Sequence, residues 1–374
     1  MLQEKILTMK KKIETNIVAY LVNDIHITPK TIPTVKDVFS QLETLCTENG
    51  VHWILIGGDV FTARSGQPLQ CLIAWGDILT SLQRQGITVS VIPGNHDKTD
   101  QDSNESYLQI YGTWPNVHLH EQGEIEIATD KLAFAFVPFY KSNDRWKQEY
   151  DRAAERIEDC FRDGDIDRNA KTILITHAAI NGVRNNDGSE VEDGEEPALF
   201  EDWTWVLVGH YHNYSRIGSN IVYTGSAYQG NYGETADHKG FTAIYSDGHI
   251  EALESCFPKY VKEVLSVNDR EALQEVLSKY NPESSKDYIR LEFHGKNEER
   301  NKVNAAELER LGFDVKYVPD EITEAMADSV SETLTNYDKR SLMKDFMKFC
   351  ADSGIRGARL KYGLDLIRNI NIER

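Results

Sequence analysis

The sequence lacks any long run of apolar residues. The longest runs, such as Ile17 to Val22, contain six residues, whereas a membrane-spanning helix needs about 18 or more. The Lys-rich stretch before Ile17 also lacks the apolar core of a secretory signal. These absences predict a protein with no transmembrane helix and no cleaved leader, and we expect no membrane partner.

Cysteine is scarce and scattered. The five cysteines among 374 residues are odd in number, and no two have the close spacing of a zinc-binding or redox motif. Few, scattered cysteines are typical of a protein in a reducing compartment, where disulfides do not form. We therefore expect a cytoplasmic protein.

Basic residues are outnumbered by acidic ones. Lys and Arg total 41 against 60 Asp and Glu, which gives a net charge of −19. Such a chain cannot coat nucleic acid by electrostatic attraction alone, although an enzyme whose site supplies its own cations can still act on it. The hydrophobic share of 40% and the charged share of 27% exclude a disordered, collagen-like or coiled-coil chain.

The first half of the chain alternates between apolar strands and helical patterns. We expect strands at 16–22, 53–56 and 88–92, with helices at 34–46 and 70–82 between them. This alternation predicts an α/β fold with a largely parallel sheet, and we expect the whole domain to be an α+β sandwich. Shorter strands are predicted at 117–119, 125–127, 132–137, 172–176, 205–208, 221–223 and 241–245.

From Val261 onward the pattern resets. The pattern predicts a small βαβαβ unit. Its strands are expected at 261–267, 288–293 and 313–318, and its helices at 270–279 and 299–311. Only helical patterns follow, at 322–334, 339–350 and 356–370. We therefore predict three domains: an α/β catalytic domain at 1–258, a capping domain at 259–320 and a basic helical region at 321–374.

Each strong cluster of polar residues stands just after an apolar strand. Because the carboxyl ends of strands in one parallel sheet lie at the same edge, where ligands of α/β folds bind, we expect these side chains to converge. The converging candidates are Asp24, His26, Asp59, Asn95, His96, Asp97, His177, His210 and His212.

Seven of these side chains have the chemistry of metal ligands. Imidazoles mixed with carboxylates and one amide oxygen, without a thiolate, suit Mn²⁺, Fe²⁺ or Zn²⁺ better than Ca²⁺. Seven ligands are too many for one ion, whereas two ions bridged by one carboxylate fit the number. Two ions ~3.5–4 Å apart activate a water and clamp the attacking and leaving oxygens of a phosphoester. The pattern therefore predicts a phosphoester-cleaving centre.

The order and spacing of these motifs resemble those of the calcineurin-like metallophosphoesterases. The motifs are Asp24-x-His26, Gly58-Asp59, Gly94-Asn95-His96-Asp97, His177 and Gly209-His210-x-His212. Within that superfamily the chain is most similar to the SbcD-type DNA repair nucleases, which include recombination endonuclease subunits of tailed phages. Residues 223–226, 232–234 and 239–241 add to this resemblance, which covers about 17–245.

The resemblance implies a role for each candidate residue. One metal would be held by Asp24, His26, Asp59 and His212, and the other by Asp59, Asn95, His177 and His210, with Asp59 bridging. The ions would be two Mn²⁺, with Mg²⁺, Fe²⁺ or Zn²⁺ as alternatives. His96 would lie against the scissile phosphate, oriented by Asp97. Thr62 and Arg64 depart from the family, which usually has an acidic residue or a histidine in this turn.

The resemblance also implies partners. Leu342, Met343, Phe346 and Met347 form an apolar helix face. This face either packs within the chain's own helical region or docks on the coiled-coil base of an SMC-like ATPase of the SbcC type. Such an ATPase would help an acidic protein to bind DNA, the implied substrate, and the capping domain at 259–320 is the expected DNA-binding domain. The resemblance further suggests a homodimer. The acidic sequence suits the cytoplasm of a bacterium or a phage-infected host.

These observations leave three alternative functions. The first is a two-metal-dependent DNA nuclease, a double-strand exonuclease and single-strand endonuclease of recombination, repair or replication. The second is a small-molecule phosphodiesterase or a phosphomonoesterase. The phosphatase branch usually has Gly-Asn-His-Glu and carries Arg-Gly after its Gly-Asp motif, whereas this chain has Asp97 and Val60-Phe61-Thr62 at these places. The third is a scaffold without activity, against which the intact ligand set argues. We expect the nuclease.

Overall fold

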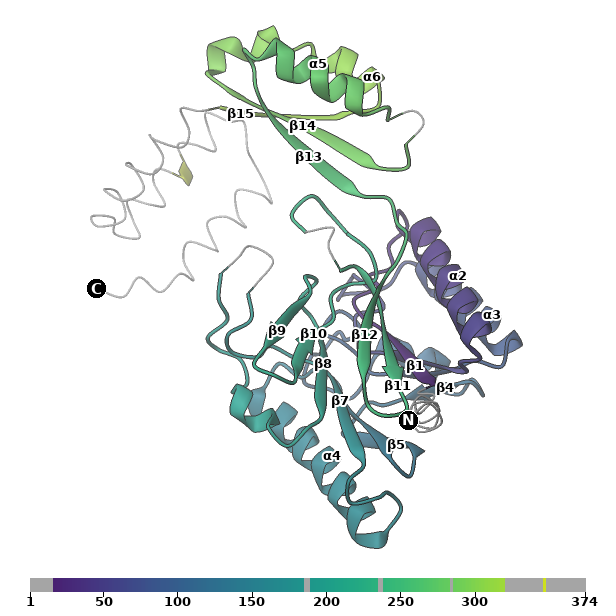
Figure 1. Cartoon of the computed structure of the whole chain (residues 1–374). Coiled ribbons are helices and arrows are strands. Elements are labelled where there is room, and N and C mark those ends of the chain that lie inside the picture. The colour runs from purple at the N-terminus through teal and green to yellow at the C-terminus, as the bar shows by residue number, and fades with distance from the viewer. Residues whose placement is uncertain (1–15, 185–188, 235–237, 283–284, 320–345, 348–374) are drawn as a thin grey trace, which may run out of the picture. The chain divides into compact units, whose positions relative to one another are not determined.

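The computed structural model describes residues 16–184, 189–234, 238–282, 285–319 and 346–347 (Figure 1). The chain divides into two compact units, one that ends at Tyr260 and one that starts at Val261. The helices predicted after residue 321 lie outside the described residues, apart from 346–347, so the helical region stays a prediction. Among the described helices, none is long and apolar enough to cross a membrane.

Two six-stranded sheets form the centre of the first unit (Figure 1). The strand order in the first sheet is β12 (Ile250–Glu254), β11 (Gly240–Tyr245), β1 (Ile17–Val22), β2 (Trp53–Ile56), β3 (Thr88–Val91) and β4 (Val117–Leu119). The order in the second sheet is β5 (Glu124–Thr129), β6 (Leu132–Val137), β7 (Lys171–His177), β8 (Trp205–Gly209), β10 (Ile221–Tyr223) and β9 (Ser215–Ile217). Two short 3₁₀ helices, η1 (Tyr107–Tyr111) and η2 (Pro197–Phe200), lie in the connections.

This mixed α/β sandwich confirms the predicted fold class, but the prediction that one parallel sheet carries the whole site is wrong. The parallel strands β1, β2 and β3 belong to the first sheet, and the parallel strands β7 and β8 belong to the second. Each of these strands is buried on both faces, because one face packs on the other sheet and the other face on helices. A strand buried on both faces has the same continuous apolar pattern whether the site strands form one sheet or two, so the sequence does not distinguish these arrangements.

Apolar packing on both sides of each sheet holds the first unit together. The inner faces of the two sheets meet in a core that includes Leu55 and Phe134. The helices α2 (Ile32–Asn49) and α3 (Leu69–Arg84) cover the first sheet, and α4 (Asn143–Asp163) covers the second. Each large apolar side chain buried in this way stabilises the fold by about 1.5–3 kcal/mol. This packing fixes the positions at which the strands end.

The helix α4 shows how local sequence sets these boundaries. Ser142 precedes it and accepts a hydrogen bond from the N–H of Arg145 at 3.3 Å, and Gly164 ends it with a φ of 82°. Trp146 and Ala153 are among the buried residues that repeat along one face of the helix. That face packs against the second sheet.

The second unit contains the predicted βαβαβ order. Its elements are β13 (Tyr260–Ser266), α5 (Arg270–Lys279), β14 (Tyr288–Gly295), α6 (Ala305–Arg310) and β15 (Asp314–Pro319), with β14 in the middle of the sheet. The helix predicted at 299–311 is instead a 3₁₀ helix, η3 (Asn297–Lys302), followed by α6. Asn304 separates the two, because its side chain accepts a hydrogen bond from the N–H of Glu307 at 3.3 Å and starts a new helix.

His120 links the neighbouring edges of the two sheets through carboxylates. Its buried ring donates from Nδ1 to Glu124 at 2.7 Å and from Nε2 to Glu126 at 2.6 Å, and it stacks on Phe136. Glu126 also contacts Nδ1 of His118 at 3.0 Å. Burial lowers the pKa of His120, but the two carboxylates outweigh burial and raise that pKa above its ordinary value of 6.5. The hydrogen bond from His120 lowers the pKa of Glu124.

We expect the stabilisation by His120 to disappear in alkaline solution. Because the pKa of the ring is raised in the folded state, its contribution is complete below about pH 6.5 and is lost as the pH rises through the folded-state pKa. Because the pKa of Glu124 is lowered, its carboxylate loses its charge, and with it this contribution, only in acidic solution. His120→Gln should therefore reduce the free energy of unfolding strongly at about pH 6 and weakly at about pH 9.5, measured by urea denaturation. An equal reduction at both pH values would contradict this interpretation.

Candidate active site

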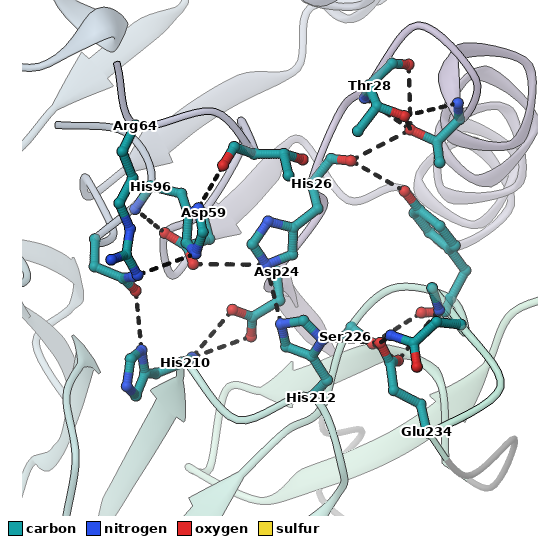
Figure 2. Close-up of a pocket in the computed structure, with 16 residues that line it drawn as sticks. Asp24, His26, Thr28, Asp59, Arg64, His96, His210, His212, Ser226 and Glu234 are labelled. Carbon is teal, nitrogen blue, oxygen red and sulfur yellow. Dashed lines mark hydrogen bonds and ion pairs between the residues drawn. The ribbon is translucent and has the colours of Figure 1, made fainter. Parts of the chain in front are cut away.

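The carboxyl ends of five strands from the two sheets meet in the first unit. β1, β2 and β3 lead into Asp24, Asp59 and Asn95, while β7 ends at His177 and β8 leads into His210. The backbone N–H of His210 donates to the Asp24 carboxylate at 3.1 Å and so joins the two sheets. Figure 2 shows the side chains that converge around the resulting cavity.

Asp24, His26 and His212 form a first group whose ligand atoms lie within 4.8 Å of one another. The Nε2 atoms of His26 and His212 are 3.0 Å apart (Figure 2). The outer nitrogens are occupied, because Nδ1 of His26 lies 3.2 Å from the carbonyl oxygen of Phe61 and Nδ1 of His212 lies 3.0 Å from Oε1 of Glu234. Both rings therefore turn Nε2 inward.

A second group surrounds the carboxylate of Asp59. Oδ2 of Asp59 lies 3.4 Å from Nε2 of His177 and 3.6 Å from Nε2 of His26, so it stands between the two groups. Oδ1 of Asn95 lies 3.1 Å from Nε2 of His177 and 2.9 Å from Nδ1 of His210. The structure thus brings all seven predicted ligands together, and Asp59 lies between His26 of the first group and His177 of the second.

The donor set fits a divalent metal. A carbonyl oxygen only accepts, so Nδ1 of His26 carries the ring proton and its Nε2 presents a lone pair. Burial lowers the pKa of His26 to about 4, so this ring is neutral at physiological pH. Two inward imidazole nitrogens 3.0 Å apart repel unless a proton or a cation lies between them, and outer acceptors of this kind are typical partners of metal-binding histidines.

The backbone at the strand ends is strained where the predicted ligands lie. Among the described residues other than glycine, five have positive φ angles, and four of these are Asp24, His26, Asp59 and His210. Such conformations are uncommon away from glycine and cost of order 1–3 kcal/mol each. The surrounding packing holds these residues in conformations that turn their side chains toward one point.

Gly94 is required for the close approach of two loops. A Cβ atom at this position would lie 2.2 Å from Oδ1 of Asp59 and 2.4 Å from its backbone nitrogen. We expect Gly94→Ala to displace Asp59, to destabilise the fold by about 1–3 kcal/mol and to weaken Mn²⁺ binding measured by calorimetry. Gly66→Ala is the control, because a Cβ there meets no atom within 4 Å. Unchanged Mn²⁺ binding in Gly94→Ala would contradict this expectation.

His96 lies at the wall of the cavity beside the two ligand groups. Its backbone N–H donates to Oδ1 of Asp59 at 2.8 Å, and its Nδ1 contacts the carbonyl oxygen of Thr62. Nε2 lies 3.3 Å from Nη2 of Arg64. Because the carbonyl oxygen of Thr62 only accepts, Nδ1 carries the ring proton, and Nε2 accepts from the guanidinium of Arg64 at the cavity wall.

Asp97, which was predicted to orient His96, contacts the backbone instead. Its carboxylate accepts hydrogen bonds from the N–H groups of Phe61 and Gly94 at 2.9 Å and of Val60 at 3.3 Å. Burial, together with the charge of Asp59, raises the pKa of Asp97 to about 7. Asp97 therefore joins the loops after β2 and β3, and any effect on His96 passes through the backbone.

The cavity has a volume of about 400 Å³ and is lined by most of the predicted site residues together with others. Arg64 was noted in the sequence only as a departure from the family pattern, and it lines the cavity. Glu234 was noted only as part of the resemblance, and it contacts His212. Phe139 was not predicted at all; its ring stacks on His210 at 5.7 Å between centroids. No spacing rule in the sequence connects Phe139 to the ligands.

The chain belongs to the calcineurin-like phosphoesterase family. The family profile matches residues 18–214, which is more than half of the chain and contains the whole ligand set. This family membership agrees with the geometry above and with the predicted resemblance. It makes the chain a phosphoesterase-type hydrolase with candidate divalent metal ligands.

Three relatives give the family match more detail. The chain is 22% identical over 228 residues to a protein of Invertebrate iridescent virus 3 named as a phosphoesterase, 078R (60% of this chain and 61% of that protein). It is 24% identical over 208 residues to exonuclease subunit 1 of Enterobacteria phage T4 (55% and 56%). It is 24% identical over 243 residues to the SbcD subunit of the nuclease SbcCD of Staphylococcus saprophyticus (60% and 63%). The matches span about six tenths of the length of these relatives.

Proposed function

We propose that this protein is a two-metal-dependent DNA nuclease that acts as a double-strand exonuclease and a single-strand endonuclease. The observation that carries the proposal is the Asp59 carboxylate, which stands between two groups of inward-facing ligands at an open cavity. Two of the relatives are named as an exonuclease subunit and a nuclease subunit, which supports DNA as the substrate. The expected processes are DNA recombination, repair and replication.

The seven ligands would hold two ions. The first ion would be held by Asp24, His26, Asp59 and His212. The second would be held by Asp59, Asn95, His177 and His210. Mn²⁺ is the expected metal, with Mg²⁺, Fe²⁺ or Zn²⁺ as alternatives. When bound, the ions supply positive charge and lower the pKa of the water that attacks phosphorus.

The protein's own residues position the phosphodiester. Nε2 of His96 accepts from Arg64 at the cavity wall, and once a phosphate takes over the guanidinium, a protonated His96 would donate from Nε2 to the oxygen that leaves phosphorus. The guanidinium of Arg64 stands beside that nitrogen, where it can neutralise a phosphate oxygen. The carboxylate of Asp97 holds the loop that carries His96.

The partners expected besides DNA are an SMC-like ATPase of the SbcC type and a second copy of the chain. Both nuclease relatives are named as subunits, which supports an assembly. Four residues are predicted to bind the ATPase. Leu342 and Met343 lie outside the described residues, whereas Phe346 and Met347 are described, and Met347 is 52% exposed. The expected location is the cytoplasm of a bacterium or of a phage-infected host.

Exposed apolar side chains on α3 and η1 support the proposed homodimer. Leu69 and Ile73 on α3 are 70% and 55% exposed, and Ile110 on the adjacent η1 is 57% exposed. We expect Ile73→Glu to halve the mass measured by light scattering. Ile127→Glu, at a 43% exposed position on β5, should leave the mass unchanged. A wild type that runs at 42.6 kDa, the mass of one chain, would contradict the homodimer.

Cleavage of two DNA substrates tests the proposed function. End-labelled linear duplex and closed single-stranded circles would be incubated with Mn²⁺, Mg²⁺ or EDTA. We expect the duplex to shorten and the circle to open only when a metal is present. Turnover of p-nitrophenyl phosphate with both DNAs uncut, in a repeat that includes the candidate ATPase and ATP, would favour a small-substrate phosphoesterase instead.

A further inference from the structure

A buried ion pair stands directly behind His212. The carboxylate of Glu234 and the ammonium of Lys239 are 2.8 Å apart, and these residues are only 6% and 0% exposed. Figure 2 shows Glu234 close to His212 at the edge of the cavity. Taking two charges out of water costs free energy that their attraction often only offsets. Stability alone therefore does not account for the pair.

Lys239 directs its three hydrogen bonds to His212 and its surroundings. Its Nζ donates to the carbonyl oxygen of His212 at 2.6 Å, to Oε2 of Glu234 at 2.8 Å and to Oγ of Ser226 at 2.8 Å. An ammonium has three N–H groups, so its donors are all used. Lys239 thus holds His212 by its backbone and holds the carboxylate that contacts its ring.

Glu234 is fixed so that one oxygen faces the ring of His212. Oε1 lies 3.0 Å from Nδ1 of His212 and accepts from Nδ2 of Asn231 at 2.9 Å. Oε2 accepts from the backbone N–H of Gly230 at 3.2 Å as well as from Lys239. The carboxylate therefore has little freedom to turn away from the ring.

The acceptor behind His212 differs from those behind two other ligand rings. Nδ1 of His26 lies 3.2 Å from the carbonyl oxygen of Phe61, and Nδ1 of His177 lies 2.9 Å from that of Gly57. A carboxylate is a stronger acceptor than a carbonyl oxygen. It fixes the tautomer of the ring and makes the opposite nitrogen a better metal donor.

We propose that Glu234 and Lys239 are positioning residues that set the metal affinity of the group formed by Asp24, His26 and His212. This inference rests on the metal centre of the proposed function and does not depend on DNA as the substrate. The second group has no contact with the Glu234 carboxylate among the hydrogen bonds of the described residues. The two metal sites should therefore respond differently when Glu234 loses its charge.

Titration of the full-length metal-free protein with Mn²⁺, followed by calorimetry and by electron paramagnetic resonance, tests the proposal. In Glu234→Gln we expect one of two sites to bind Mn²⁺ about 10–100-fold more weakly, while the other keeps its affinity. The matched control is Glu149→Gln, which neutralises a fully buried carboxylate paired with Arg145 at 2.6 Å on α4. This control should lower the melting temperature in EDTA and leave both Mn²⁺ affinities unchanged.

The proposal would be overturned if folded Glu234→Gln kept both Mn²⁺ affinities. It would also be overturned if Glu234→Gln and Glu149→Gln lost Mn²⁺ affinity to the same extent. If Glu234→Gln does not fold, the Zn²⁺-loaded wild type decides by ¹H–¹⁵N spectroscopy of its histidines. A downfield, slowly exchanging Nδ1–H resonance of His212 supports the proposal, and its absence overturns it. A wild type that binds Mn²⁺ but leaves DNA uncut would refute the nuclease and leave this proposal standing.

Discussion

Replacement of Asp59 by asparagine is expected to abolish cleavage and to leave at most one Mn²⁺ per chain. Oδ2 of Asp59 lies within 3.6 Å of ring nitrogens from both ligand groups, on His26 and His177. Burial alone would raise the pKa of Asp59, but the adjacent His177 outweighs burial and holds that pKa well below its ordinary range, so the side chain is a carboxylate. An amide cannot bridge two cations with two negative oxygens. We expect a loss of about a thousandfold in kcat, as for the removal of a central electrostatic group.

The control for this substitution is the same change on the surface. Asp77 is 59% exposed at its side chain and pairs only with Lys36 among the described ion pairs. Asp77→Asn should keep full activity and both ions. The measurements are cleavage of labelled duplex and metal content by mass spectrometry after removal of free Mn²⁺. If Asp59→Asn retained two ions and substantial activity, the bridging role would be refuted.

Replacement of His96 by alanine should give the opposite combination, with activity lost and metal retained. The ring of His96 contacts Thr62 and Arg64 and packs edge-on against the ring of His26 at 5.1 Å between centroids, but its only hydrogen bond to a candidate ligand among the described residues is from its backbone N–H to Asp59. That backbone contact survives the substitution. Loss of a proton donor to the leaving oxygen is expected to reduce kcat by about 10²–10⁴, while Mn²⁺ affinity stays within about twofold, below the 10–100-fold loss expected when a ligand's support is removed.

The exposed His52 provides the matched control for this experiment. His52 precedes β2, and His52→Ala should change neither kcat nor Mn²⁺ content. The two readouts, cleavage rate and bound metal, separate a catalytic role from a ligand role. Loss of Mn²⁺ from His96→Ala would show that His96 is needed for the metal centre itself and would refute the role given to it here.

The convergence of the candidate ligands could be predicted because the sequence marks both the apolar strands and the polar residues directly after them. Asp24, Asp59 and Asn95 each come within a few residues of the end of an apolar strand, and parallel strands end at a common edge. The structure brings these residues together, as expected from that rule. The sequence could not reveal that the edge belongs to two sheets, because a strand buried on both faces has the same pattern in either arrangement.

The supporting residues could not be predicted because their contacts are set by the fold. Glu234 lies 22 residues after His212 in the sequence, and only the return of the chain beside the cavity brings them within 3.0 Å. Arg64 reaches His96 across loops that follow different strands. The family resemblance implied that Asp97 orients His96, yet its carboxylate accepts from three backbone N–H groups. Adjacent residues need not share a hydrogen bond when buried backbone donors compete.

Anomalous X-ray scattering from crystals that contain Mn²⁺ tests the two-metal centre most directly. The expected result is two anomalous peaks in the first unit, one beside His26 and His212 and one beside Asn95, His177 and His210, with Asp59 in contact with both. A single peak, or peaks away from Asp59, would contradict the two-metal centre on which the proposed phosphodiester cleavage depends.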